Sequence, residues 1–120
     1  MIGYHNSKHK FSKPCYEMVK KNRENHGNGE LGLWYSTTND WQKGFGGICY
    51  TFEVLGKELR LPFKVFQDLC YSEDSPTFYE DQRNQWLKEG YAFLSIIEQN
   101  GREAMGIVLD FGAITYWEVK

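Results

Sequence analysis

The chain has 120 residues, a length that suits one domain (1–120) and can bury a core without disulfides or structural metals. Its net charge of −2 argues against binding a nucleic-acid backbone by bulk electrostatics. No apolar run has the length of a membrane span, and no signal segment opens the sequence, which predicts a cytoplasmic protein without a membrane partner. The three cysteines are odd in number and widely spaced, so we expect reduced thiols and no metal site: Cys15, Cys49 and Cys70.

Two biases of the composition bear on function. Aromatic residues reach 17%, which suits a core and also suits a pocket that stacks on a flat ligand. Residues 1–29 carry six Lys or Arg against two Glu. This basic third could attract a small anionic ligand, although a solvated helix face explains it equally well.

The first part of the chain predicts an extended start at 3–7, a helix, a strand at 30–37 and a short helical turn at 41–45. The helix has Ser12 as its N-cap and Pro14 in its first turn, where the missing N–H does no harm. It must end in the glycine-rich segment after His26.

The second part predicts a strand at 48–55, a shorter one at 58–61, and helices at 62–71 and 76–89. Gly90 ends the second helix as a C′ residue. Strands at 91–98 and 102–109 and a last apolar segment at 113–117 follow. Strands follow strands without regular helix alternation, so the residues predict an α+β fold with one or two small antiparallel sheets and helices packed outside.

Asn100-Gly101 predicts a type I′ hairpin turn between these two strands, because both central residues of that turn need positive φ. In that register Glu98 stands opposite Glu103. Alternation then puts both carboxylates on the face of Leu94 and Ile96. Facing like charges are destabilising in a sheet, so the pair is either exposed to water or has a function.

Three segments, in this order, resemble the motifs of ADP-ribosyltransferase-like domains. Tyr4-His5-Asn6-Ser7 resembles Y-H-G-[ST], and Gly32-Leu33-Trp34-Tyr35-Ser36 resembles G-[LI]-Y-F-[SAT]. The stretch from Gly90-Tyr91 through Glu98, with Glu103 and Ile107-Val108-Leu109-Asp110, resembles the closing "G-Y-D … E … V-V-F-D" strands. The trio covers most of the chain. The nearest members are compact bacterial and phage-borne ones, some of which are anti-CRISPR or other host-modifying enzymes.

The resemblance implies an NAD-dependent mono-ADP-ribosyltransferase that modifies a macromolecule, with a protein as acceptor and the host cytoplasm as location if a phage encodes it. It implies two small, mostly antiparallel sheets that hold NAD in a cleft between them. His5 would contact a ribose, Trp34 would stack on the nicotinamide, and an acid of the third motif would bind the nicotinamide ribose. The implied cofactor-binding set is Tyr4, His5, Asn6, Trp34, Tyr35, Ser36 and Phe45.

The sequence departs from these motifs at three positions. Trp34 stands where the family has Tyr, Asn6 replaces Gly, and Met105 occupies the place of the acid in one subfamily. The implied catalytic acids are Glu98, which ends the Gly90-Tyr91 strand and takes the principal role, and Glu103, which would orient the acceptor. Because alternation sends Trp34 and Tyr35 to opposite faces, we expect Trp34 to face the ligand.

Two other functions fit the sequence. A non-catalytic domain of the same fold could bind a protein partner or a nucleotide, the motif departures being the sign of lost chemistry. An interaction domain unrelated to the family would show no effect of NAD on its melting temperature.

Overall fold

The computed structural model describes residues 1–8, 10–17, 28–38 and 47–119. Its elements, in chain order, are β1 (Ile2–Ser7), η1 (Asn28–Leu31), β2 (Leu33–Ser36), β3 (Ile48–Val54), β4 (Lys57–Pro62), α2 (Phe63–Tyr71), α3 (Phe78–Lys88), β5 (Tyr91–Ile97), β6 (Glu103–Val108), η3 (Phe111–Ala113) and β7 (Ile114–Val119).

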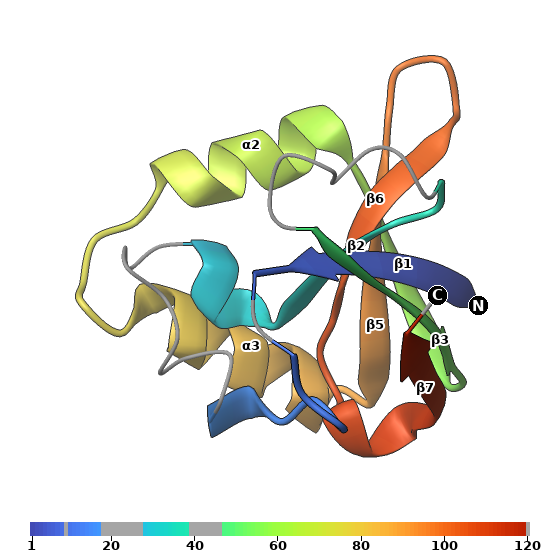
Figure 1. The fold of residues 1–120 in the computed structure, drawn as a ribbon. Coiled ribbons are helices and arrows are strands. Elements are labelled where there is room, and N and C mark those ends of the chain that lie inside the picture. Colours follow the sequence, from blue (N-terminus) through green and yellow to red (C-terminus); the bar gives the residue numbers. More distant parts are fainter. Residues whose placement is uncertain (9, 18–27, 39–46, 120) are drawn as a thin grey trace.

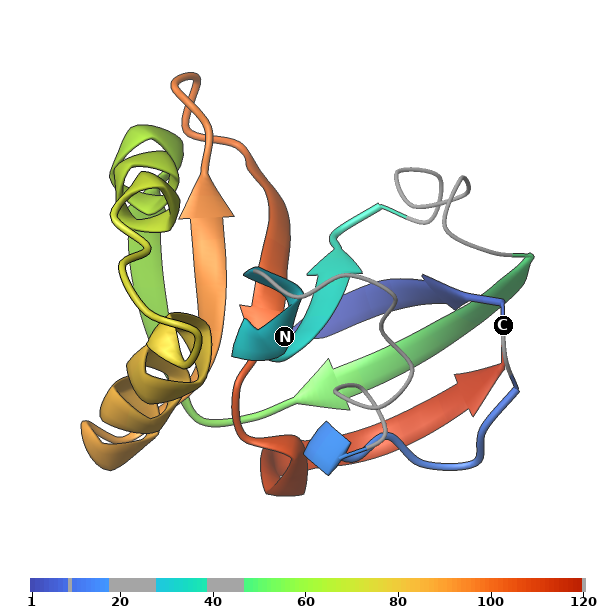
Figure 2. The same ribbon diagram turned by 90° about the vertical axis from the view of Figure 1, so that its left-hand side faces the viewer.

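The strands form one seven-stranded mixed sheet in the order β4-β5-β6-β2-β1-β3-β7. β4 and β5 are parallel and every other pair is antiparallel. The expected pair of small sheets with a cleft between them is therefore wrong, because β2 hydrogen-bonds to both β1 and β6 and joins the two halves. Figure 2 shows the twist of this sheet: β4, β5 and β6 stand upright, while β1, β3 and β7 run across the view.

The two helices lie against the β4–β5 half of the sheet, away from β7 (Figure 1). Their apolar sides pack on one face of the sheet, here called the helix face, in a cluster of buried residues: Leu31, Phe66, Tyr79, Trp86, Leu94, Ile96, Ile107 and Leu109. Alternating residues form a second cluster on the opposite face, here called the second face: Leu33, Tyr35, Phe52, Val54, Ala92, Phe93, Val108, Phe111 and Ile114. The sheet thus has a core on each side.

Most predicted elements are confirmed within a residue or two, and the differences are local. The predicted strand at 30–37 is shorter, because residues 28–31 form η1 and β2 covers Leu33–Ser36. The helix expected from Pro14 begins at Tyr16, and its later residues lie outside the described part of the chain, as does the turn at 41–45. β4 forms as predicted, but it lies at the edge of the sheet opposite to β7 and pairs with β5, not with β3.

Candidate functional site

The three motif segments lie on four neighbouring strands near the middle of the sheet: the first on β1, the second on β2, and the third on β5 and β6. Tyr4 of β1 pairs with Ser36 of β2, and Ser36 pairs with Met105 of β6. The fold therefore brings together segments that are about a hundred residues apart in the sequence.

His5 is anchored to the second motif through its ring. Its Nδ1 lies 2.6 Å from the carbonyl oxygen of Trp34. Because a carbonyl oxygen only accepts, Nδ1 carries the hydrogen and Nε2 is left as the acceptor of the neutral ring. Burial lowers the pKa of His5, and the bond to the Trp34 carbonyl opposes this with a smaller effect. His5 is thus a neutral, oriented hydrogen-bond acceptor near pH 7.

Aromatic rings surround His5 on the second face. Its ring centroid lies 6.5 Å from that of Phe11 and 6.3 Å from that of Trp117. Tyr50 and Trp117 stack with centroids 4.7 Å apart, and the Tyr50 hydroxyl accepts a hydrogen bond from the Phe11 backbone. These contacts hold the imidazole in one orientation, as a ligand-binding His requires.

Trp34 and Tyr35 lie on opposite faces of β2, as the sequence predicts. The indole of Trp34 is half-buried on the helix face and meets Phe66 of α2 edge-on at 5.7 Å. Tyr35 is 1% exposed on the second face, and its hydroxyl donates to the Leu94 carbonyl at 3.1 Å. Burial raises the pKa of Tyr35 above its ordinary value. Tyr35 is consequently a core residue, and Trp34 is the member of the pair that retains exposed surface.

The hydroxyl of Tyr35 reaches β5 because the intervening residue of β6 is Gly106, its direct partner. A Cβ atom on Gly106 would lie 2.2 Å from the Tyr35 oxygen and 2.2 Å from the Leu94 carbonyl oxygen. No side chain fits there, so glycine at this position is required for the cross-strand contact.

The structure separates the predicted cofactor-binding residues into two sets. His5 and Tyr35 project to the second face, whereas Tyr4, Asn6, Trp34 and Ser36 belong to the other face by strand alternation. The rings of His5 and Trp34 therefore do not line one surface, although the His5 ring bonds to the Trp34 backbone. Phe45 lies outside the described residues.

The expected pairing of Glu98 with Glu103 is wrong. Glu103 pairs with Ile97, and the register shifts beyond Ile96. The backbone N–H of Gly101 donates to the Glu98 carbonyl, and Gly101 alone in this loop has positive φ, at +83°. A three-residue loop of this kind replaces the type I′ turn and moves the pairing by one residue.

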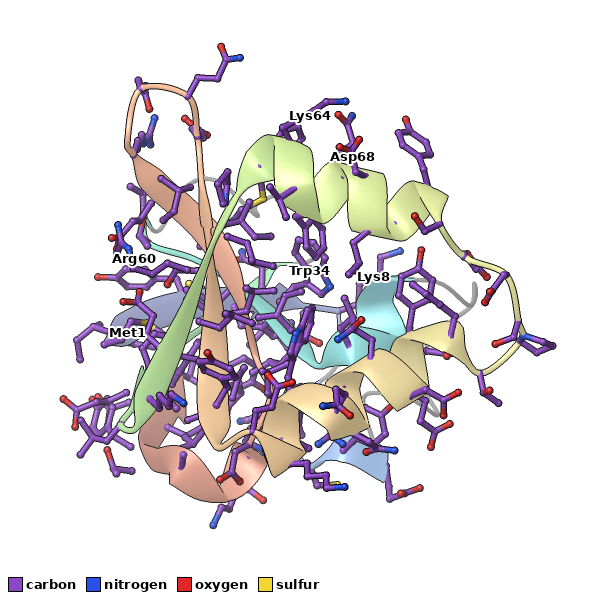
Figure 3. The ribbon with its side chains drawn as sticks, turned by 180° about the vertical axis from the view of Figure 1, so that it is seen from behind. Met1, Lys8, Trp34, Arg60, Lys64 and Asp68 are labelled. Atoms are coloured by element: carbon purple, nitrogen blue, oxygen red, sulfur yellow. The ribbon has the colours of Figure 1, made fainter. Side chains whose placement is uncertain are left out.

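This shift sends the two carboxylates to different surroundings. Glu98 lines an open groove between the hairpin and the start of α2, together with Phe63 and Lys64. The Glu103 carboxylate contacts the guanidinium of Arg60 on β4. Figure 3 shows Arg60 on the opposite side of β4 and β5 from Trp34 and the helices. Glu103 therefore leaves the face of Leu94 on which the predicted register placed it.

Glu103 belongs to a polar cluster that the sequence analysis missed. Arg60 contacts both Glu103 and Glu58, the latter at 3.5 Å, and its pKa is raised, mainly by the hydrogen bond to Glu103. Ser95 donates to Glu58 at 2.5 Å and lies 3.4 Å from the Tyr35 hydroxyl. The alternation in Lys57–Pro62 could have put Glu58 and Arg60 on one face, but no local pattern shows which strand they adjoin.

Within the described residues, no group of His, Cys, Asp and Glu has the geometry of a metal site, and no helix there is long and apolar enough to span a bilayer. The chain matches no protein-family model and no curated protein. Among solved structures it is similar to a crystal structure of an anti-CRISPR protein, with a TM-score of 0.55 and 13% identity over 100% of this chain and 95% of that chain. At this identity the likeness shows a shared fold alone.

Proposed function

We propose that this protein is an NAD-dependent mono-ADP-ribosyltransferase whose acceptor is a macromolecule, most simply a protein. One observation carries the proposal: the strands that hold the motifs, among them β1, β2 and β6, are neighbours in the sheet. In addition, the ring of His5 in the first motif is hydrogen-bonded to the backbone carbonyl of Trp34 in the second. A sequence resemblance without relevance to the fold would not be expected to bring its segments side by side. NAD would then lie across these central strands of a single sheet.

His5 has the features needed to bind a sugar hydroxyl. It is neutral, its Nδ1 is committed to the Trp34 carbonyl, and Nε2 is left to accept a hydrogen bond from a ribose. Trp34 lies on the opposite face of the sheet, so one NAD molecule bound at His5 does not stack on its indole. The aromatic rings on the face of His5 are those of Phe11, Tyr50 and Trp117. A flat ring there would position the nicotinamide as a leaving group.

Of the two candidate carboxylates, Glu103 fits the role better than Glu98. The Thr37 hydroxyl donates to the Glu103 carbonyl at 2.6 Å, which ties the start of β6 to the end of β2. Arg60 orients the Glu103 side chain. Glu98 instead lines the groove beside the start of α2. We therefore transfer the principal role from Glu98 to Glu103.

The chemistry requires one carboxylate and an oriented sugar. Cleavage of the glycosidic bond releases nicotinamide and leaves positive charge on the ribose, which a preorganised carboxylate stabilises more than it stabilises the ground state. The acceptor nucleophile then bonds to the anomeric carbon and passes its proton to that carboxylate or to water. Loss of the carboxylate is expected to slow this step by about 10² or more.

The choice of a protein as acceptor follows the motif resemblance, whose compact members include anti-CRISPR enzymes, and the similar solved structure is itself that of an anti-CRISPR protein. A second function, a non-catalytic domain that binds a protein partner, is favoured by one observation. Met105 stands at the motif position of the acid and pairs with Ser36 on β2, so the position nearest the second motif carries no charge.

Melting curves with and without NAD, run beside an assay for nicotinamide release, test the proposal. NAD at about 100 times its Kd should stabilise the protein by about 2.7 kcal/mol, and His5→Ala should remove most of that gain. Asp74→Ala, at an exposed position in the loop between α2 and α3, is the control. Stabilisation without nicotinamide release, in the presence of host lysate, would favour the non-catalytic domain. No stabilisation at any NAD concentration would reject the transferase and leave the domain that binds a protein partner.

A further inference from the structure

The β1–β3–β7 part of the sheet has a face that is turned away from the second-face core. Along one row Ile2 pairs with Glu53 and Glu53 with Tyr116. Along the next row Tyr4 pairs with Thr51 and Thr51 with Glu118. Alternation places all six side chains on the same face, because their neighbours Gly3, Phe52 and Trp117 pack toward the core. These six residues are here called the outer face.

The outer face is accessible. Ile2 is 48% exposed and Tyr116 is 44% exposed. The described helices pack on β4, β5 and η1 instead, at the other end of the sheet. Figure 2 shows α2 and α3 far from β7. A half-solvated antiparallel sheet is common, but an exposed Ile2 and an exposed Tyr116 on either side of Glu53 suit a contact surface.

The charge of this face has one sign. The three strands read IGYHNS, ICYTFEV and ITYWEV, and their acidic residues are Glu53 and Glu118, without a Lys or Arg in any of them. Glu53 accepts a hydrogen bond from Thr115 at 2.9 Å, and a hydrogen bond to Glu118 raises the pKa of Tyr116. Both carboxylates thus have neutral partners, whereas Glu103 at the other end of the sheet contacts a guanidinium.

We propose that the outer face is the docking surface for a partner protein that presents a cluster of Lys or Arg side chains. Tyr and Ile supply contact area at low entropic cost, and the carboxylates of Glu53 and Glu118 complement the cations. The same charge repels nucleic-acid phosphates. A two-fold dimer through this face would bring four carboxylates together without counter-charges, so a second copy is a poor occupant. The proposal does not depend on NAD chemistry.

Backbone amide NMR with model peptides tests this assignment. A peptide of alternating Arg and Leu should shift resonances of β1, β3 and β7, and a peptide of alternating Glu and Leu should not. E53K/E118K should weaken binding of the Arg peptide about tenfold or more, because two complementary charges become repulsive. E53Q/E118Q, a milder change that keeps the side-chain shape, should weaken it less but in the same direction.

The matched control is E73K/D74K, which changes the net charge equally at two exposed positions before α3. It should alter the affinity less than about twofold. Equal losses of peptide affinity in E53K/E118K and E73K/D74K would mean that only net charge matters, and would overturn the proposal. Peptide-induced changes in amide resonances centred on β4 would also overturn it. Binding of the Glu peptide or of an RNA oligonucleotide to these strands would also overturn it. The proposal would be overturned too if sedimentation showed a dimer and E53Q/E118Q changed the strength of its association.

Discussion

The Nδ1 atom of His5 is 2.6 Å from the carbonyl oxygen of Trp34, so a side chain of β1 is bonded to the backbone of β2. This contact fixes the tautomer of the imidazole and the rotation of its ring. Four measurements follow from this contact and from its neighbours in the sheet.

The first measurement is the pH dependence of stability. Burial lowers the pKa of His5 in the folded state below its ordinary value of 6.5, so the unfolded chain binds the proton more tightly. The contribution of His5 is fully present above about pH 6.5 and is lost as the pH falls toward the folded pKa. Denaturant unfolding should show a steeper loss below pH 6.5 in the wild type than in His5→Gln. Both proteins retain His9 and His26, so parallel curves would show that His5 is not the cause.

The second measurement separates the two aromatic residues of β2. NAD bound at His5 should quench tryptophan fluorescence, and most of the quench should persist in Trp34→Phe, because Trp34 lies on the opposite face of the sheet. Trp117→Phe should remove most of it, because the Trp117 ring centroid lies 6.3 Å from that of His5. Tyr35→Phe should keep the quench and lower the free energy of unfolding by about 1 kcal/mol, since it removes the hydrogen bond to Leu94. Loss of NAD binding in Tyr35→Phe alone would reverse the assignment.

The third measurement concerns the two carboxylates. In an assay of transferase rate, Glu103→Gln should cause a loss of about 10² or more, and Glu98→Gln should cost much less. Glu98 lines the groove by α2, and Glu103 is held by Arg60 at the start of β6. Because Glu103→Gln also removes an ion pair, melting temperatures must be compared. A larger loss in Glu98→Gln would return the principal role to Glu98.

The fourth measurement tests the close packing of Gly106 against Tyr35. Gly106→Ala should lower the free energy of unfolding by about 3 kcal/mol, because its Cβ atom would overlap the Leu94 carbonyl, which is backbone and cannot turn aside. Combining it with Tyr35→Phe should recover only part of the loss. Gly47→Ala, where the added Cβ atom meets nothing within 4 Å, is the control. A stable Gly106→Ala protein would contradict the packing of Tyr35 over β6.

Local patterns in the sequence determined most of the elements. The caps, glycines and apolar periods located the strands at 48–54 and 57–62 and both helices, because these signals act over a few residues. Strand alternation also predicted that Trp34 and Tyr35 face opposite ways, since that follows from the backbone alone. The three motifs lie on strands that are neighbours in the middle of the sheet.

The tertiary structure decided what local patterns do not encode. The pairing of β2 with both β1 and β6 made one sheet where two were expected, and pairing partners are chosen by long-range packing. The three-residue loop at Gly101 moved Glu103 by one position and turned its carboxylate to Arg60, forty-three residues away in the sequence. A one-residue change of register sends a side chain to the other face, so the face on which Glu103 lies could not be predicted from the sequence.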